Sequence, residues 1–530
     1  MLPAHFDPVI VGIAAATLVV ALTAVARRLP LPTPILQLIA GFVVGLIPGI
    51  VVPDLSPDLV FSVFLPPILW SAAMFTSLRD FGRNLRPIGT LAVGLVLVTT
   101  AVVAVVAHTL FPGLPWAIAV ALGAIVSPPD AIAATAIVSR LPVPRRVITV
   151  LEGESLVNDA TALVVYRTAT IAAVTGTFSW GESVVRFFID AGVGALVGLF
   201  VAWLTIRAAK LTKDALGETL LTLAAPYVAW IAGESLHVSS VLACVAGGVY
   251  LQQRLSTAVG PLSRLQIRTT WDLVVFLLNS LIFLLLGSQV SVLLTLQRGG
   301  QLTTLLRNGA LITLAVIVVR AVWVQLLMAV PKISHAVRSR REGKPSWRAL
   351  VLVSWTSMRG VITLATALAL PRMLADGRPF PYRDELVIVA LCVIVFTLVV
   401  QGLSLAPLIR LLHFAPEETQ LAEERLARRE TTRRAAEMLE DLSHEDGVDP
   451  RDVDALRAEV RERVRQTEQA GGSYVGRRRL RLSMIGAERR MLIRLRNEAA
   501  ISDDVLRSLE LELDLEAVRA GAGEERKPPR

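Results

Sequence analysis

Long apolar segments recur along this chain up to about residue 414, and they constrain its fold more than any other feature. A bilayer core about 30 Å thick needs about 20 apolar residues in helical form, and each segment has roughly that length. Within a bilayer only helices and closed barrels satisfy their own backbone groups, and a barrel would need a different sequence pattern. The sequence therefore predicts an all-α polytopic membrane protein with about thirteen transmembrane helices, at residues 8–26, 34–50, 59–77, 87–110, 115–139, 146–174, 183–206, 217–236, 238–253, 269–296, 304–330, 348–371 and 384–412.

The composition indicates a membrane domain followed by a soluble tail. Hydrophobic residues make up 54% of the 530 residues and charged residues 18%, whereas soluble proteins are about one quarter charged. Arg and Glu concentrate after the last apolar segment. We expect residues 1–414 to form a transmembrane domain and residues 415–530 a cytoplasmic helical tail, with regulation as one interpretation of its role. The net charge of +9 arises largely in loops beside the bilayer, so we expect no nucleic-acid partner.

The positive charges also predict an orientation. Twenty Lys and Arg residues lie in six alternate loops, and six lie on the opposite side. Loops rich in Lys and Arg remain in the cytoplasm. We therefore expect a multi-pass protein of the plasma membrane with its N-terminus outside and its tail in the cytoplasm.

Two of the predicted helices are interrupted near the middle of the membrane. The first contains SPPD at residues 127–130, and prolines there remove backbone donors and clash with the preceding turn. Ser127 could cap a new half-helix, with Pro128 at its first position and Asp130 near its positive end. The second has Arg359 at its centre, in SWTSMRGVITLA. Matching interruptions in two halves of a chain are typical of a transporter with a binding site at mid-membrane, and ordinary kinks are the alternative.

The sixth predicted helix carries carboxylates, which at this depth usually pair or line an ion path. Ser155 and Asp159 are four residues apart and share one face of this helix. Glu154 lies about 140° around the helix from Asp159. Because a guanidinium needs a fixed anion, we expect Arg359 to pair with Glu154 and to leave Asp159 free. We expect Arg320 to hold the broken helices through hydrogen bonds to freed carbonyls, and a purely structural set of ion pairs is the alternative.

A free aspartate at this depth has a definite chemistry. Asp159 can hold one hard monovalent cation together with oxygens from Ser155 and from unwound backbone, or it can hold one proton. Burial of a carboxylate favours its protonated form. Competition between the two ligands would couple their movements in opposite directions.

The stretch GESLVND at residues 153–159 resembles the G-E-S-x-x-N-D signature of the monovalent cation–proton antiporters, in the branch with Asn-Asp on the ion-carrying helix and in its bacterial form. Supporting similarity lies in FLPPILWSAAMFTSLRDF, WDLVVFLLNSLIFLLLGSQV and SWTSMRGVITLATALALP, and the resemblance spans residues 8–413. It implies two inverted repeats with crossed interrupted helices, and usually a homodimer. It implies a secondary active antiporter that exchanges Na⁺ for H⁺ by alternating access in pH and sodium homeostasis, with K⁺ or Li⁺ as alternative cations.

The resemblance also implies roles for single residues. Asp159 carries the ion or proton, Ser155 coordinates the ion, and Asn158 corresponds to the Asn of electroneutral members. The transported Na⁺ is then the substrate of Asp159 and Ser155, and we expect no cofactor. We also assign Ser127 and Asp130, at the first interruption, to the ion site. Glu154 and Arg359 resemble the structural ion pair of the family.

Two positions depart from the family pattern and leave the role of Asp130 open. Many members carry an acid where this chain has Ser71, and Pro128 stands where the family often has Asp in Thr-Asp-Pro. Asp130 either replaces that acid or caps the half-helix, and we favour the cap. With Asp159 as the one clearly free carboxylate, we expect one proton to exchange for one cation.

Two other classes of function are alternatives. An ion channel could use the same polar path. An intramembrane hydrolase could use Ser155 as nucleophile, but the second Gly of the G-x-S-x-G motif is missing and His108 and His237 lie toward the outer face. We therefore expect a transporter and not an enzyme.

Overall fold

The computed structural model describes the chain in twelve stretches, and the regular elements in them are helices. One isolated bridge joins Met373 and Pro379 within a loop. The all-α fold class is therefore confirmed for the described residues, which are 8–26, 31–47, 56–138, 141–176, 180–212, 214–296, 301–329, 346–414, 418–444, 449–468, 473–498 and 503–519.

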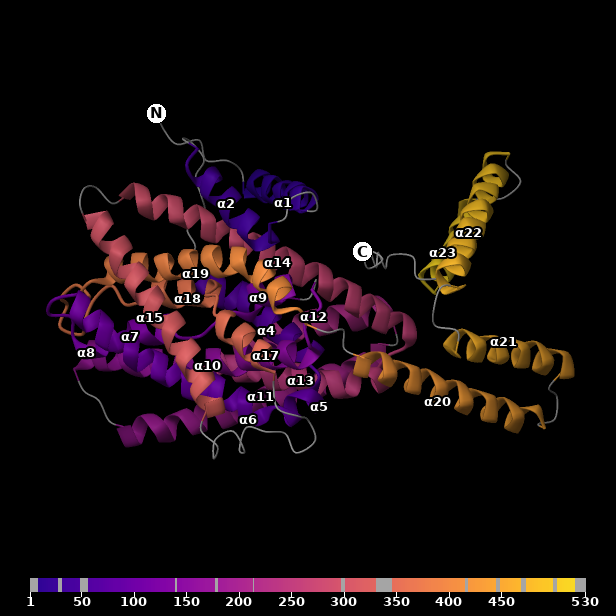
Figure 1. Ribbon diagram of the computed structural model, residues 1–530, viewed down its shortest axis with the longest axis horizontal. Coiled ribbons are helices and arrows are strands. Elements are labelled where there is room, and N and C mark those ends of the chain that lie inside the picture. Colours follow the sequence, from indigo (N-terminus) through magenta and orange to yellow (C-terminus); the bar gives the residue numbers. More distant parts are fainter. Residues whose placement is uncertain are drawn as a thin grey trace. The chain divides into compact units, whose positions relative to one another are not determined.

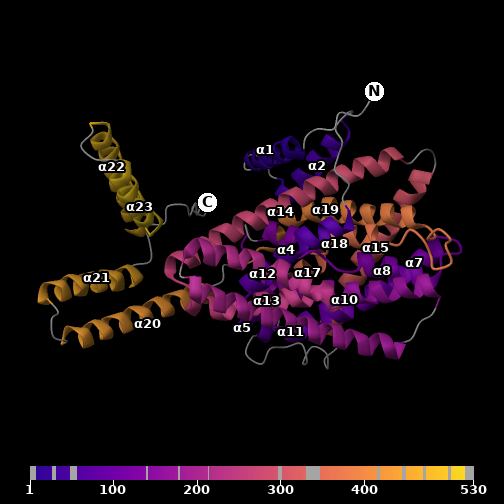
Figure 2. The same ribbon diagram turned by 180° about the vertical axis from the view of Figure 1, so that it is seen from behind.

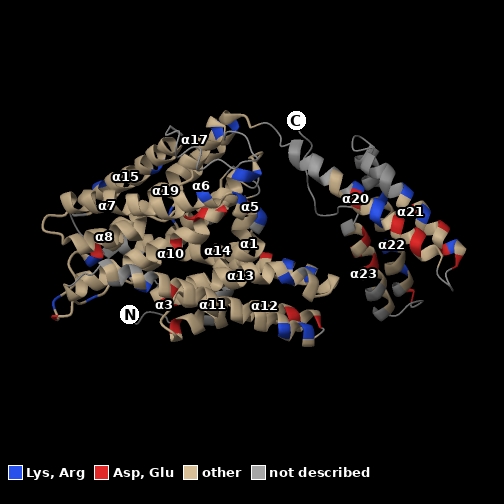
Figure 3. Ribbon diagram, turned by 90° about the horizontal axis from the view of Figure 1, so that it is seen from below, with Lys and Arg blue, Asp and Glu red and all other residues tan. Residues whose placement is uncertain are grey.

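The chain divides into two compact units, residues 1–416 and 417–530, close to the boundary expected after residue 414. In the second unit, α20 packs on α21 and α22 packs on α23, with bounds Glu418–Ser443, Pro450–Glu468, Ser473–Asn497 and Asp503–Arg519. Figure 3 shows that these helices carry both signs of charge, whereas most of the first unit is uncharged.

The first unit contains the helices that correspond to the apolar segments (Figure 1). Two of these segments each contain a π-helical stretch, η1 between α3 and α4 and η2 between α6 and α7, and each continues as a helix through it. Their bounds are α1 Pro8–Ala26, α2 Thr33–Gly45, α3 Pro57–Leu59, η1 Val60–Phe64, α4 Leu65–Phe75, α5 Leu78–Arg83, α6 Leu85–Gly89, η2 Thr90–Leu95, α7 Val96–Leu110, α8 Trp116–Val126, α9 Ala131–Val138, α10 Arg145–Thr175, α11 Trp180–Thr212, α12 Ala215–Ser235, α13 Ser240–Ala258, α14 Pro261–Leu296, α15 Gln301–Ala329, α17 Trp347–Trp355, α18 Val361–Leu368 and α19 Arg383–Leu412.

Seven helical stretches of the described residues are long and apolar enough to cross a membrane. Each of the other expected spans is also helical, but is shorter, interrupted or more polar. A multi-pass membrane protein is therefore confirmed, and the count of thirteen crossings stays a prediction. The seven stretches are Pro57–Phe75, Leu85–Leu110, Phe188–Thr212, Ala215–Ser235, Pro261–Ser291, Leu302–Leu327 and Arg383–Leu412.

Both expected interruptions are present. Residues 127–130 separate α8 from α9, and residues 356–360 separate α17 from α18. The expected start of the second half-helix at Pro128, with Ser127 as its cap, is wrong, because α9 begins at Ala131. Pro128 precedes a second proline, and the ring of a proline disfavours helical backbone in the residue before it.

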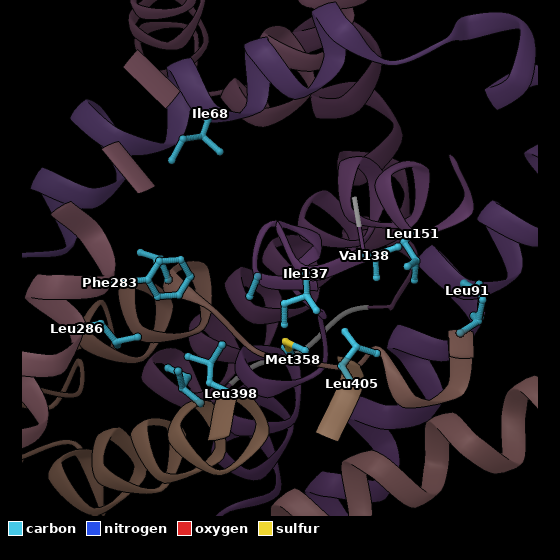
Figure 4. Packing of buried hydrophobic residues seen from close by; sticks show 14 of the residues in the cluster. Ile68, Leu91, Ile137, Val138, Leu151, Phe283, Leu286, Met358, Leu398 and Leu405 are labelled. Carbon is cyan, nitrogen blue, oxygen red and sulfur yellow. The ribbon is translucent and has the colours of Figure 1, made fainter. Parts of the chain in front are cut away.

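The two interruptions meet in space. The backbone N–H of Asp130 donates to the carbonyl oxygen of Met358 at 2.7 Å. Around this contact α18 packs on α8 and α19, and α9 packs on α10 and α19. Figure 4 shows Met358 within the apolar cluster that surrounds the crossing. The interrupted helices therefore contact each other at their breaks, as predicted.

A second group of helices packs through close backbone contacts. Helix α14 lies beside α2, as Figures 1 and 2 both show. A Cβ atom at Gly41 would lie 1.9 Å from the carbonyl oxygen of Leu284, and one at Gly287 would lie 2.0 Å from that of Leu38. Only glycine permits such an approach. Helix α14 is thus held tightly against α2, and α13 packs in the same group against α4, α11 and α12.

Candidate functional site

A cavity of about 290 Å³ lies beside the crossing of the two interrupted helices. Its walls come from α4, α9, α10, α14 and α18 and from the interruptions themselves, and most of them are apolar. Polar groups converge on it from all five helices, which is the usual character of a binding site. The polar lining residues are Ser71, Thr76, Asp130, Thr135, Glu152, Ser155, Asp159, Asp272, Asn279 and Thr363.

Helix α10 presents Asp159 and Ser155 to this cavity, so the prediction that they share one face of the helix is confirmed. Asp159 is 7% exposed and lies near the middle of α10. Among the described residues, no hydrogen bond or ion pair engages its carboxylate. Asp159 is therefore available to a ligand inside the cavity.

Asn158 and Ser127, which we assigned to the ion site, are absent from the described cavity lining. Asn158 is fully buried, and its Nδ2 donates to the carbonyl oxygen of Pro129 at 2.8 Å, so it ties α10 to the first interruption. The hydroxyl of Ser127 donates to the carbonyl oxygen of Ala124 at 3.1 Å. Both side chains shape the break beside the cavity.

Asp130 lies in the same cavity as Asp159, close enough for its charge to act on that carboxylate. Its Oδ2 occupies the space in front of Gly360, where an added Cβ atom would lie only 1.6 Å away. Gly360 immediately precedes α18, and the N-terminal end of a helix stabilises negative charge. Asp130 thus faces the start of the other broken helix, and it also directly precedes α9, so the prediction that it caps its own helix stays a prediction.

Glu154 pairs with Arg320, and the expected pair with Arg359 is wrong. Nη1 and Nη2 of Arg320 donate to the two carboxylate oxygens of Glu154 at 2.5 and 2.8 Å, and both side chains are at most 2% exposed. The Nε of Arg320 donates to the carbonyl oxygen of Val353 at 2.9 Å. This bidentate geometry gives both carboxylate oxygens of Glu154 a charged donor.

Arg359 fills the role that we expected for Arg320. Its Nε donates to the carbonyl oxygen of Val126 at 2.8 Å and its Nη2 to that of Ser127 at 3.0 Å. Its Nη1 donates to Ser357. The last carbonyls of a helix have no partner within it, and the break of α8 places them beside Arg359. A buried guanidinium with five donors therefore joins the two interruptions.

Asp272 and Asn279 of α14 reach the cavity, and our sequence-based assignment of the site did not include them. They are seven residues apart, which places them on one face of a helix two turns apart. This spacing of polar residues in an apolar helix was the available signal. The sequence did not show that α14 faces α10 across a cavity.

One part of the cavity lining lies close in sequence to the Arg-rich loops. Thr76, Glu152 and Asp272 line the cavity, and Arg79, Arg146 and Arg268 follow or precede them within six residues. Residues of α7, α8 and α19 contribute to a buried apolar cluster that includes Leu122, Val126 and Val389. The part of the lining with Thr76, Glu152 and Asp272 is therefore nearest to the loops that the sequence predicts to be cytoplasmic.

Sequence comparison agrees with this geometry. The family described as sodium/hydrogen exchanger, transmembrane, matches residues 14–411, which include every part of the cavity. The chain belongs to the sodium/hydrogen exchanger family.

Individual relatives extend this result. An uncharacterized Na⁺/H⁺ exchanger of Mycobacterium tuberculosis is 33% identical over 524 residues, which are 96% of this chain and 95% of the relative. A sodium, potassium, lithium and rubidium/H⁺ antiporter of Bacillus pumilus is 34% identical over 385 residues, which are 71% of this chain and 57% of the relative. The solved structure of the sodium proton antiporter MjNhaP1 of Methanocaldococcus jannaschii matches with a TM-score of 0.57 and 19% identity, over 76% of this chain and 97% of that one. This likeness shows a shared fold.

Proposed function

We propose that this exchanger moves Na⁺ against H⁺ across the plasma membrane by alternating access, with Asp159 as the group that binds each in turn. The observation that carries the proposal is the pairing pattern. Arg320 engages Glu154, whereas Asp159 faces the cavity beside Ser155 with no partner among the described residues.

The apolar surroundings of the site support alternating access. A channel needs a path that is open at both ends, and we propose that the buried apolar cluster that includes Leu122, Val126 and Val389 closes one side of the cavity. A bound ion can leave on that side only after the helices rearrange. Because Asp159 holds either a cation or a proton, each passage of one ligand requires the return of the other.

The charges at the crossing support a one-for-one exchange. The crossing contains the guanidinium groups of Arg320 and Arg359 and the carboxylates of Glu154, Asp130 and Asp159. With all five ionised, this cluster carries one negative charge. A single Na⁺ or a single proton neutralises it, so either form can move through the bilayer without net charge.

The names of relatives support Na⁺ as the transported cation and also include other alkali cations. An antiporter of Aphanothece halophytica that is 30% identical is named for Na⁺ and H⁺, and the Bacillus pumilus relative is named for four alkali cations. We propose Na⁺ as the principal substrate, with K⁺ and Li⁺ as competitors. The proposal also includes an external N-terminus, a homodimer, and a cytoplasmic tail at residues 417–530 that regulates exchange.

The test is sodium-driven proton flux in proteoliposomes. The wild-type protein should move protons when Na⁺ is added, and Asp159→Asn should move none although it folds and inserts. Asp376→Asn, in an exposed loop outside the cavity, is the matched control and should behave as wild type. Flux that persists in Asp159→Asn would contradict the assignment.

The same vesicles test the one-for-one cycle. One net charge couples to the membrane potential by about 2.3 kcal/mol per 100 mV. Flux at zero potential and at about 100 mV of either sign, set with K⁺ and valinomycin, should therefore be nearly equal. A strong dependence on the potential would indicate a second proton carrier, and Asp130 is the carboxylate placed to be one.

A further inference from the structure

Asn279 lines the cavity with an amide that no group of the described residues satisfies. Its Oδ1 is buried without a hydrogen-bond partner, and its Nδ2 has none among the described residues. A buried polar group without a partner is costly, and native proteins contain few of them. A ligand bound in the cavity would supply the missing partner of this amide and offset that cost.

The position of Asn279 matches that of Asp159. Asn279 lies near the middle of α14, and Asp159 lies near the middle of α10. Helix α14 packs on α2, α4 and α12. The cavity receives Asp159 from one wall and Asn279 from another.

We propose that Asn279 supplies an oxygen ligand to the cation bound at Asp159 and thereby sets the preference among monovalent cations. This inference rests on the proposed function of the same cavity. Amide oxygens of Asn and Gln are ordinary ligands of hard cations. The two ends of an amide have nearly the same shape, so a half-turn of the side chain presents oxygen to the cavity.

A neutral ligand suits this site. The amide oxygen replaces one water molecule of the cation's hydration shell and adds no charge. The charged groups at the crossing therefore still become neutral with one cation. A proton on Asp159 needs no such ligand. Asn279 therefore discriminates between cations and leaves proton binding to the carboxylate. Because α14 is held against α2, the distance between Asn279 and Asp159 would favour one ionic radius over others.

The test compares apparent affinities for Na⁺, Li⁺ and K⁺ in proteoliposomes of the full chain. A hydrogen bond or ligand contact to a charged group corresponds to about a tenfold change in affinity. Asn279→Ala should raise the half-saturating Na⁺ concentration about tenfold and change the Na⁺ to Li⁺ and Na⁺ to K⁺ ratios. The maximal rate at saturating Na⁺ and the indifference to membrane potential should remain.

Asn308→Ala is the matched control. Asn308 is a buried asparagine of α15 whose Oδ1 also lacks a partner, and it does not line the described cavity. This variant should keep the wild-type cation ratios. Asn279→Asp keeps an oxygen and adds a charge, so its exchange should gain a dependence on membrane potential. It also provides the test if the alanine variant fails to fold.

The outcomes separate this inference from the function on which it rests. A wild-type protein without cation-dependent proton flux, or an active Asp159→Asn, overturns the proposed function. An active wild type together with unchanged cation affinities and ratios in Asn279→Ala overturns only the role of Asn279. Equal changes in Asn279→Ala and Asn308→Ala would show a general structural effect and would also refute it.

Discussion

Replacing Glu154 by Gln should leave Arg320 as an unpaired cation inside the membrane. The two Nη atoms of Arg320 lie 2.5 and 2.8 Å from the carboxylate oxygens of Glu154, and solvent reaches at most 2% of either side chain. Removing one partner of a buried pair costs about 3–5 kcal/mol, because the remaining charge is stranded. We expect Glu154→Gln and Arg320→Gln each to lower the free energy of unfolding by about that amount.

The double variant distinguishes a true pair from two independent sites. With both residues replaced by Gln, two neutral amides remain and no charge is stranded. The loss should then be smaller than the sum of the single losses, by a coupling energy of about 2–3 kcal/mol. In the parallel cycle of Glu154→Gln with Arg359→Gln the coupling should be smaller, because Arg359 donates to backbone carbonyls of Val126 and Ser127.

The assay is equilibrium unfolding in mixed micelles, followed by the helical circular dichroism signal. The three single variants and two double variants are compared with wild type at one pH and one detergent composition. A coupling energy near zero between Glu154 and Arg320 would refute the pairing. A coupling between Glu154 and Arg359 that equals or exceeds it would restore the pair expected from the sequence.

Two further predictions concern the second interruption and the tail. Gly360→Ala should reduce exchange at least about tenfold, because the new Cβ displaces the carboxylate of Asp130. Gly89→Ala is the control and should exchange normally, because a Cβ atom at Gly89 meets no atom within 4 Å. Equal flux in the two variants would contradict this prediction. In the tail, hydrogen bonds from Arg457 lower the pKa of Glu440 below its ordinary value of 4.5. The contact therefore stabilises the α20–α21 hairpin fully above that ordinary pKa. This stabilisation is lost as pH falls through the lowered pKa. Pulsed electron paramagnetic resonance between labels on α20 and α21 of the full chain should show a broader distance distribution at low pH, and at neutral pH in Arg457→Gln; unchanged distances would refute the role of this pair.

Features set by short stretches of sequence were predictable. Segments of about twenty apolar residues must form helices in a bilayer, because nothing else satisfies their backbone groups. The interruption at residues 127–130 follows from two adjacent prolines, and the shared face of Ser155 and Asp159 follows from helical periodicity. Each of these depends on residues close together in the chain, and the structure contains all three.

Contacts between distant residues were decided by the tertiary structure. Glu154 had two candidate partners, and charge alone did not distinguish Arg320 from Arg359. Helix α10 packs near α17, and Arg320 lies against the carboxylate of Glu154. Arg359, in the break at residues 356–360, points toward the end of α8. The backbone N–H of Asp130, just before α9, likewise bonds to Met358, which is 228 residues away in the chain.

The cavity shows the same division. From the sequence alone, Asp159 and Ser155 follow as neighbours on one helix face, because a helix repeats every 3.6 residues whatever surrounds it. The sequence does not show which helix faces them, since an apolar surface packs against many others. Only the assembled helices place Asp130 beside Gly360 and bring Asn279 and Asp272 of α14 to the same space. Local geometry thus determined the ion-carrying face, and long-range packing determined what else a bound cation would contact.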